Sequence, residues 1–130
     1  MSLFETMAII FDSRKIKDIP TLTIGPEGAH ACPLIFFIPG YGGCKEDVLS
    51  LGYALAQQGF FVASFDPWLH GERADPLLHQ AADPALGGIY PPESGMDICI
   101  TFFRVIEHCL QDVRVLIDHY AGDSRVDTSR

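Results

Sequence analysis

Short apolar runs alternate along the chain with segments of helical period, an order typical of an α/β protein. Near the N-terminus, residues 7–11 (MAIIF) and 19–24 (IPTLTI) flank the polar segment SRKIKD. They predict an antiparallel hairpin at a sheet edge, where Pro20 is tolerated. Residues 34–38 (LIFFI) stop abruptly at Pro39-Gly40 and predict a strand buried on both faces, as in parallel sheets.

Two helices and a second buried strand follow. In residues 45–58, Val48, Leu51 and Leu55 repeat at helical spacing, and residues 60–65 (FFVASF) read as a strand. A strand–helix–strand crossover of this length is almost always parallel and right-handed. Residues 96–120 carry the clearest amphipathic period, with an apolar stripe of Ile98, Phe102, Val105, Ile106, Cys109, Val113, Leu116, Ile117 and Tyr120. We therefore predict an α/β fold whose mixed, mostly parallel sheet has an antiparallel start, a parallel body and helices on its faces.

Residues 74–95 are rich in proline and glycine and show no sustained period. Long irregular segments inside a compact domain usually run over the surface and often serve function. We interpret this segment as a surface excursion and a candidate substrate lid.

Composition narrows the classes of partner and compartment. At 130 residues the chain forms one domain at most, and its net charge of −8 with nine Lys and Arg argues against nucleic-acid or anionic-membrane partners. The four cysteines show no C-x-x-C spacing, and no histidines have metal-ligand spacing, so we expect free thiols and no metal. The chain has neither a leader pattern nor a long apolar run, and we predict a cytoplasmic protein.

The most informative stretch follows the strand at 34–38. Gly40, Gly42 and Gly43 allow a sharp turn and close backbone approach to a ligand, and Lys45-Glu46-Asp47 begins a helix with acidic residues. Backbone N–H groups therefore converge where a negative charge can sit. Neither a phosphate-binding P-loop nor a dinucleotide fingerprint fits, because no Gly-Lys-Ser or Gly-Lys-Thr follows and the G-x-G-x-x-G spacing is absent.

The segment IPGYGG followed by KEDVLSLGYALAQQGFFVASFD resembles the N-terminal half of an α/β-hydrolase. The resemblance implies that the backbone N–H of Tyr41, flanked by Gly40 and Gly42, contributes to an oxyanion hole, with Pro39 where the family usually has histidine. Residues 66–73 (DPWLHGER) resemble the family's loop after the next strand and are closest to esterase-like and dienelactone-hydrolase-like branches.

Several side chains near this loop are candidates for more specific roles. Trp68 and His70 are candidates for lining a substrate pocket, although Trp68 is as readily a packing residue. For His70 a loop-organising hydrogen bond or a place in the pocket wall is favoured over a general base, because the family's catalytic histidine lies near the C-terminus. Asp66 is expected to cap the following loop. Cys44 is a weaker candidate nucleophile, since a helix N-terminus can lower a thiol pKa.

The resemblance implies that the polar residues 123–130 lead into the strand carrying the catalytic serine. No serine of the chain lies in a G-x-S-x-G motif. We therefore expect residues 1–130 to be the N-terminal part of one α/β-hydrolase domain, truncated before the nucleophile strand, with an open hydrophobic edge on its central strand.

The implied parent activity is a serine hydrolase of carboxylic esters or related small acyl substrates, without a cofactor, and the chain as given is expected to be inactive. The alternative is a non-catalytic binding remnant of the same fold. In that case the loop and the exposed strand edge would recognise a ligand or partner.

Overall fold

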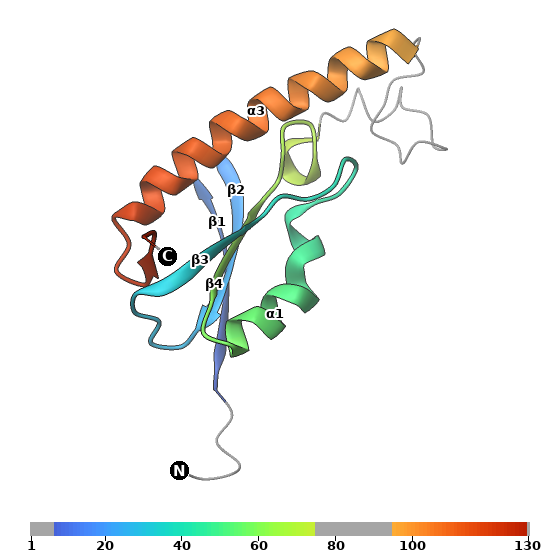
Figure 1. Cartoon of the computed structure of the whole chain (residues 1–130). Helices are drawn as coiled ribbons and strands as arrows, with labels where there is room; N and C mark the ends of the chain where they lie inside the picture. Colours follow the sequence, from blue (N-terminus) through green and yellow to red (C-terminus); the bar gives the residue numbers. More distant parts are fainter. Residues whose placement is uncertain (1–6, 75–94, 130) are drawn as a thin grey trace.

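The computed structural model describes residues 7–74 and 95–129, with side chains described from residue 100 in the second range (Figure 1). Nearly all of the predicted lid, residues 75–94, lies outside the described residues. The described strands form one sheet in the order β1-β2-β4-β3-β5. Their bounds are β1 Ile9–Ile16, β2 Ile19–Pro26, β3 Cys32–Phe37, β4 Phe61–Phe65 and β5 Val126–Asp127.

The antiparallel start of the sheet is the predicted hairpin. β1 and β2 pair from Ile9 opposite Pro26 to Ile16 opposite Ile19. The two residues of the turn, Lys17 and Asp18, have φ values of 47° and 67°, as a tight type I′ hairpin turn requires. β1 forms the sheet edge, and β2 continues inward to an antiparallel pairing with β4. The hairpin and its edge position are confirmed.

The parallel body consists of β4, β3 and β5. β3 pairs with β4 from Leu34 opposite Phe61 to Phe37 opposite Ser64. β5 pairs with β3 at two positions only, Cys32 opposite Val126 and Pro33 opposite Asp127. Strands on both sides bury every residue of β4, whereas β3 is only half-buried beyond its first residue. The expectation that residues 34–38 form a strand buried on both faces was wrong, because among the described strands the outer edge of β3 has a partner only at its beginning.

Helices cover both faces of the sheet (Figure 1). On one face lie a 3₁₀ turn, η1 (Lys45–Val48), and α1 (Leu49–Gln57), in place of the single predicted helix. Ile24, Val48, Ala56 and Val62 belong to the apolar cluster of this face, joined by Leu22. The long helix α3 (Gly95–Ala121) covers the other face, where its residues Leu116 and Tyr120 meet β4 through Phe61, Ala63 and Phe65. The α/β fold with a mixed sheet and flanking helices is confirmed.

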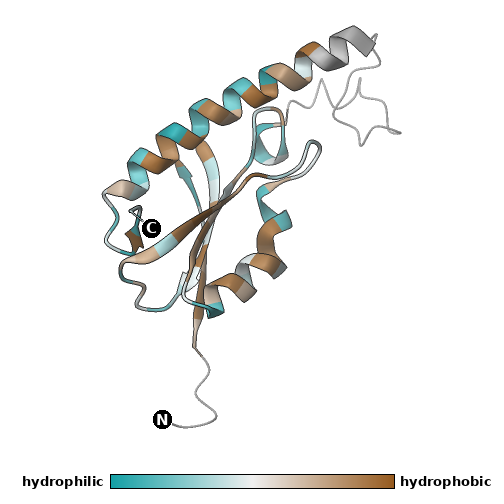
Figure 2. Cartoon of the chain, viewed as in Figure 1, coloured by the Kyte–Doolittle hydropathy of each residue, from teal (hydrophilic) through white to brown (hydrophobic). Residues whose placement is uncertain are grey.

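Part of the apolar stripe on α3 is exposed. Phe102, Ile106 and Ile117 were predicted to be buried but are 40%, 38% and 41% exposed, whereas Leu116 and Tyr120 of the same stripe are buried. In Figure 2 apolar and polar residues alternate along the coloured part of α3. The buried residues lie over β4, and the sheet ends too soon to cover the rest, because β5 contributes only two residues beside β3.

Candidate active site

The glycine loop forms a tight turn immediately after β3. The Gly43 N–H donates to the Gly40 carbonyl over 2.8 Å, and Gly42 has a φ of 93°. A closing hydrogen bond of this kind, with positive φ at the third residue, is the pattern of a type II turn. Gly43 also has no space for a side chain, since a Cβ would lie 2.3 Å from an Asp47 carboxylate oxygen. Gly42 and Gly43 are therefore favoured by the shape of this loop.

A histidine from the loop after β4 holds the middle of this turn. Nε2 of His70 accepts a hydrogen bond from the Gly42 N–H over 2.9 Å, and its Nδ1 lies 2.8 Å from the Trp68 carbonyl oxygen. Burial lowers the pKa of His70, although the Trp68 carbonyl and the Asp66 charge oppose the shift. His70 is thus a neutral, loop-organising group in the described structure, which is the hydrogen-bonding role favoured from sequence. The Gly42 N–H is committed to it.

A buried carboxylate holds the far end of the loop. Asp66 is fully buried and accepts hydrogen bonds from the Lys45 N–H (2.8 Å), the Lys45 Nζ (3.0 Å) and the Glu72 N–H (3.0 Å). The hydrogen bond that Asp66 accepts from the Glu72 N–H fits the expected capping role, but the two hydrogen bonds that it accepts from Lys45 were not predicted. Burial acts to lower the pKa of Lys45, yet the hydrogen bonds that its ammonium donates to Glu72, Glu46 and Asp66 outweigh burial and raise it. Lys45 is therefore a buried, charged ammonium.

An ion pair connects the same loop with helix α3. The Arg73 guanidinium donates to the backbone carbonyl of Asp66 over 3.0 Å and to the carboxylate of Asp112 over 2.5 Å. Asp112 lies at the polar margin of the helical pattern, a position that does not suggest a specific role from sequence. It is in fact buried, since α3 packs that margin against the loop after β4.

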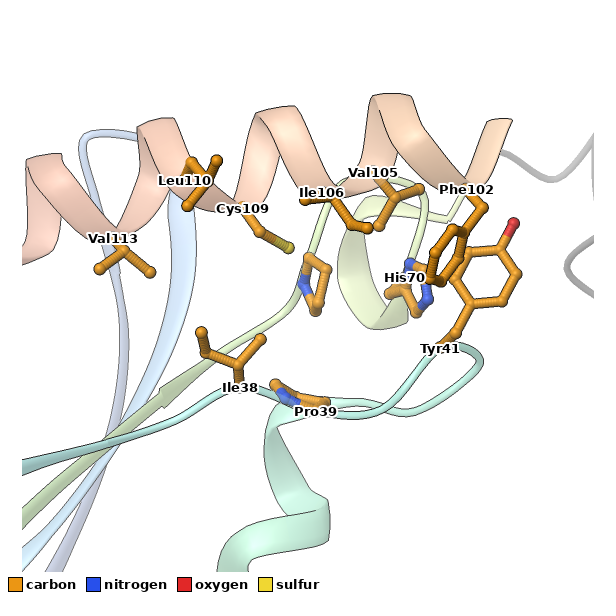
Figure 3. Close-up of a pocket in the computed structure, with 11 residues that line it drawn as sticks. Ile38, Pro39, Tyr41, His70, Phe102, Val105, Ile106, Cys109, Leu110 and Val113 are labelled. Atoms are coloured by element: carbon orange, nitrogen blue, oxygen red, sulfur yellow. The ribbon is translucent and has the colours of Figure 1, made fainter. Parts of the chain in front are cut away.

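An apolar cavity of about 240 Å³ opens beside the turn, between the end of β3, the loop after β4 and α3 (Figure 3). His70 is one of its lining residues, and the Tyr41 ring lies 5.4 Å from the His70 ring and 5.1 Å from the Phe102 ring. The lining residues are Ile38, Pro39, Tyr41, Pro67, His70, Phe102, Val105, Ile106, Cys109, Leu110 and Val113. Trp68 is not among them. Its ring stacks on His108 at 4.4 Å, a packing contact.

The structure does not favour Cys44 as a nucleophile. Burial raises the pKa of its thiol, the opposite of the shift that nucleophilic activation requires, and the nearby Glu46 and Asp47 charges raise it further. Cys32, Cys44 and Cys109 are free thiols. Among residues 7–74 and 95–129, no group of three or more His, Cys, Asp or Glu is placed to hold a metal ion. No helix in the described part of the chain is both long enough and apolar enough to cross a membrane.

Sequence reasoning missed the buried network around Lys45. The motif Lys45-Glu46-Asp47 reads as an exposed first helical turn, and nothing in its local pattern distinguishes the lysine from a solvated one. One usable signal existed. Lys45 and Asp66 each follow a predicted parallel strand, and the carboxyl ends of parallel strands meet at one edge of the sheet.

The chain is similar in sequence to part of a longer known protein. No family model matches the chain. It is 27% identical over 124 residues to a Bacillus subtilis (strain 168) protein named "Putative esterase YitV". The match covers 94% of this chain and 42% of that protein, so the chain spans less than half the length of this relative. This sequence similarity to a protein with an esterase name confirms the resemblance inferred from sequence.

Two solved structures are also similar to parts of the chain. "Crystal Structure of TT1662 from Thermus thermophilus" matches with a TM-score of 0.45 and 31% identity, covering 54% of this chain and 29% of that one. "Thioesterase Domain From Curacin Biosynthetic Pathway" matches with a TM-score of 0.38 and 17% identity, covering 62% of this chain and 28% of that one.

Proposed function

We propose that this chain is the N-terminal part of the catalytic domain of a serine esterase that acts on carboxylic esters or related small acyl substrates. The observation that carries the proposal is the glycine turn after β3, which is held from outside by His70 and Asp66. A turn needed only to connect a strand with a helix does not require two buried side chains to fix its amides. An oxyanion hole does, because its donors must be oriented before charge develops.

In the proposed reaction, a serine outside residues 1–130 attacks the substrate carbonyl carbon, and a histidine also outside them takes the serine proton. The carbonyl π electrons move to oxygen, and the Tyr41 backbone N–H stabilises the resulting oxyanion. Collapse of the tetrahedral intermediate expels the alcohol or thiol, and water then releases the acid by the same steps. Removal of one oxyanion donor typically costs ~10²–10³ in rate, but without the serine the covalent route does not exist. Residues 1–130 alone are therefore proposed to be inactive.

The surfaces that this structure leaves open support a longer parent domain. The outer edge of β3 from Leu34 to Phe37 has no described strand beside it, and β5 begins a parallel strand directed along that edge. The exposed side chains of Phe102 and Ile106 on α3 line the same cavity as Ile38, which directly follows β3. A strand edge next to exposed apolar side chains is prone to association. We propose that a continuation of β5 covers both the strand edge and these apolar side chains. We also propose a cytoplasmic location, which the free thiols support.

A fluorophosphonate probe tests this proposal, because it labels only activated serines. The test compares the protein purified from its native host, with its intact mass, and the purified chain of 130 residues; heat-denatured samples control for nonspecific labelling. We expect a labelled host protein heavier than 14.3 kDa and no labelling of the 130-residue chain. Specific labelling of a serine in the short chain would contradict the assignment of the nucleophile. A host protein of 14.3 kDa that remains unlabelled would favour the non-catalytic binding remnant.

A further inference from the structure

The central peptide of the glycine turn, between Tyr41 and Gly42, has two possible orientations. In a trans peptide the N–H and the carbonyl point in opposite directions. Type I and type II turns differ chiefly by a flip of this central peptide, which exchanges the places of these two groups. The φ of 93° at Gly42 corresponds to the type II orientation, in which the Gly42 N–H points at His70. Only glycine accommodates such a φ without strain.

The hydrogen bonds of His70 fix which of its nitrogens carries the proton. The Trp68 carbonyl oxygen can only accept, so Nδ1 must be the donor to it. The Gly42 N–H can only donate, so Nε2 must be bare. A flipped peptide would instead turn the Tyr41 carbonyl oxygen toward Nε2. Two acceptors would then face each other at a side chain that is 1% exposed, and leaving buried polar groups unsatisfied is costly.

We propose that His70 is a positioning residue that, as a neutral imidazole, holds the Tyr41–Gly42 peptide in the type II orientation and so anchors the turn that carries the Tyr41 N–H. The inference rests on the proposed function, in which that N–H is the oxyanion donor. His70 itself touches no reacting atom. Its contribution is orientation, and because the oxyanion exists only in the transition state and tetrahedral intermediate, its loss should lower kcat and leave KM nearly unchanged.

Protonation of His70 reverses the preference. An imidazolium has two N–H donors, so its Nε2 can no longer accept from Gly42 and instead favours the flipped Tyr41 carbonyl. The loop after β4 contributes the Asp66 carboxylate, whose charge favours protonation of His70 and which also accepts three hydrogen bonds. The glycine loop contributes the Tyr41 phenol. Helix α3 adds apolar side chains and the Cys109 thiol, whose pKa is raised by burial.

Nuclear magnetic resonance tests the orientation directly on the protein as its host makes it, labelled with ¹⁵N-histidine and ¹⁵N-glycine. An N–H···N hydrogen bond transmits a scalar coupling between its two nitrogens. We expect a coupling between the Gly42 amide and His70 Nε2 at neutral pH, an unprotonated shift for Nε2, and loss of the coupling in step with protonation of the ring. A protonated Nε2 at neutral pH, or no coupling to Gly42, would overturn the proposal.

Kinetics of the same protein give an independent readout. His70→Ala removes the acceptor and should lower kcat by up to ~10²-fold, the scale of a misplaced catalytic group, whereas His70→Gln places an amide oxygen near Nε2 and should restore much of the loss. His30→Ala, at an exposed histidine, is the matched control and should change neither constant. Equal kcat for His70→Ala and wild type would refute the role. A host protein that shows no serine labelling but retains the coupling would instead refute the proposed function alone.

Discussion

Asp66 is the residue whose loss should damage this structure most severely. Its side chain is fully buried and accepts three hydrogen bonds, two from Lys45 and one from the Glu72 N–H. Asp66→Ala removes all three hydrogen bonds and leaves the Lys45 ammonium, which is 3% exposed, without its most deeply buried partner. Removing one partner of a buried ion pair typically costs about 3–5 kcal/mol.

The remaining partners of Lys45 determine where in that range the cost of Asp66→Ala lies. Glu72 and Glu46 lie 2.6 and 2.9 Å from its Nζ, but both carboxylates are about half exposed, so water screens them. These two carboxylates still stabilise the ammonium. We therefore expect Asp66→Ala to lower the free energy of unfolding by about 3 kcal/mol, the lower end of that range. Lys45→Met should cost less, about 1.5–3 kcal/mol, because Asp66 keeps its two backbone N–H donors.

Urea unfolding monitored by far-ultraviolet circular dichroism measures the free energies of unfolding of Asp66→Ala, Lys45→Met and a control variant. Asp12→Ala is the matched control, since its ion pair with Arg14 is exposed and should contribute less than about 1 kcal/mol. The reasoning is refuted if Asp66→Ala lies within 1 kcal/mol of wild type, on the scale of that surface pair, or if Lys45→Met is the more destabilising change.

Three further predictions concern single groups. Tyr120→Phe should be neutral or stabilising by up to about 1 kcal/mol in urea unfolding, because the buried Tyr120 hydroxyl has no hydrogen-bond partner in the described structure. Burial raises the pKa of Tyr120 to about 12, so the unfolded state releases the phenol proton at a lower pH than the folded state does. The wild-type protein should therefore lose stability above pH ~10, and Tyr120→Phe should not show this loss. Gly71→Ala should cost more than about 1 kcal/mol, since φ is 53° and a Cβ would lie 2.3 Å from the Asp66 carboxylate, whereas Gly40→Ala meets no atom within 4 Å; equal melting temperatures would contradict this. The lowered pKa of His70 means that the unfolded state binds its proton first as pH falls, so stability should drop below pH ~6.5, and less so in His70→Gln.

The sequence predicted the elements well where a single period dominates. The amphipathic repeat of residues 96–120 anticipated α3 within one residue at each end, and the apolar runs anticipated β3 and β4. Burial was less predictable, because the exposure of a strand or stripe depends on what lies beside it. The LIFF run was assigned to the interior from its composition, yet β4 is the enclosed strand and β3 is not.

The candidate site was predictable in its backbone and not in its side-chain network. Glycines after an apolar run indicate a turn because few other residues adopt the required φ. The bonds that hold this turn connect residues 28 positions apart for Gly42 and His70, and 21 apart for Lys45 and Asp66. No local period encodes such pairs. Chemical complementarity suggests them only once the topology has brought two strand ends together.

The same network bears on how the proposed site is divided along the chain. The turn is held by His70 at its centre and by Asp66 at its end, and Arg73 connects that framework to α3 through Asp112. All of these groups lie within residues 1–130, whereas the outer edge of β3 beyond Pro33 has no described strand beside it. If the proposed function holds, the first half of the domain orients the donor and the second half supplies the nucleophile. The two halves then meet along β3, and the donor is fixed before the nucleophile strand is in place.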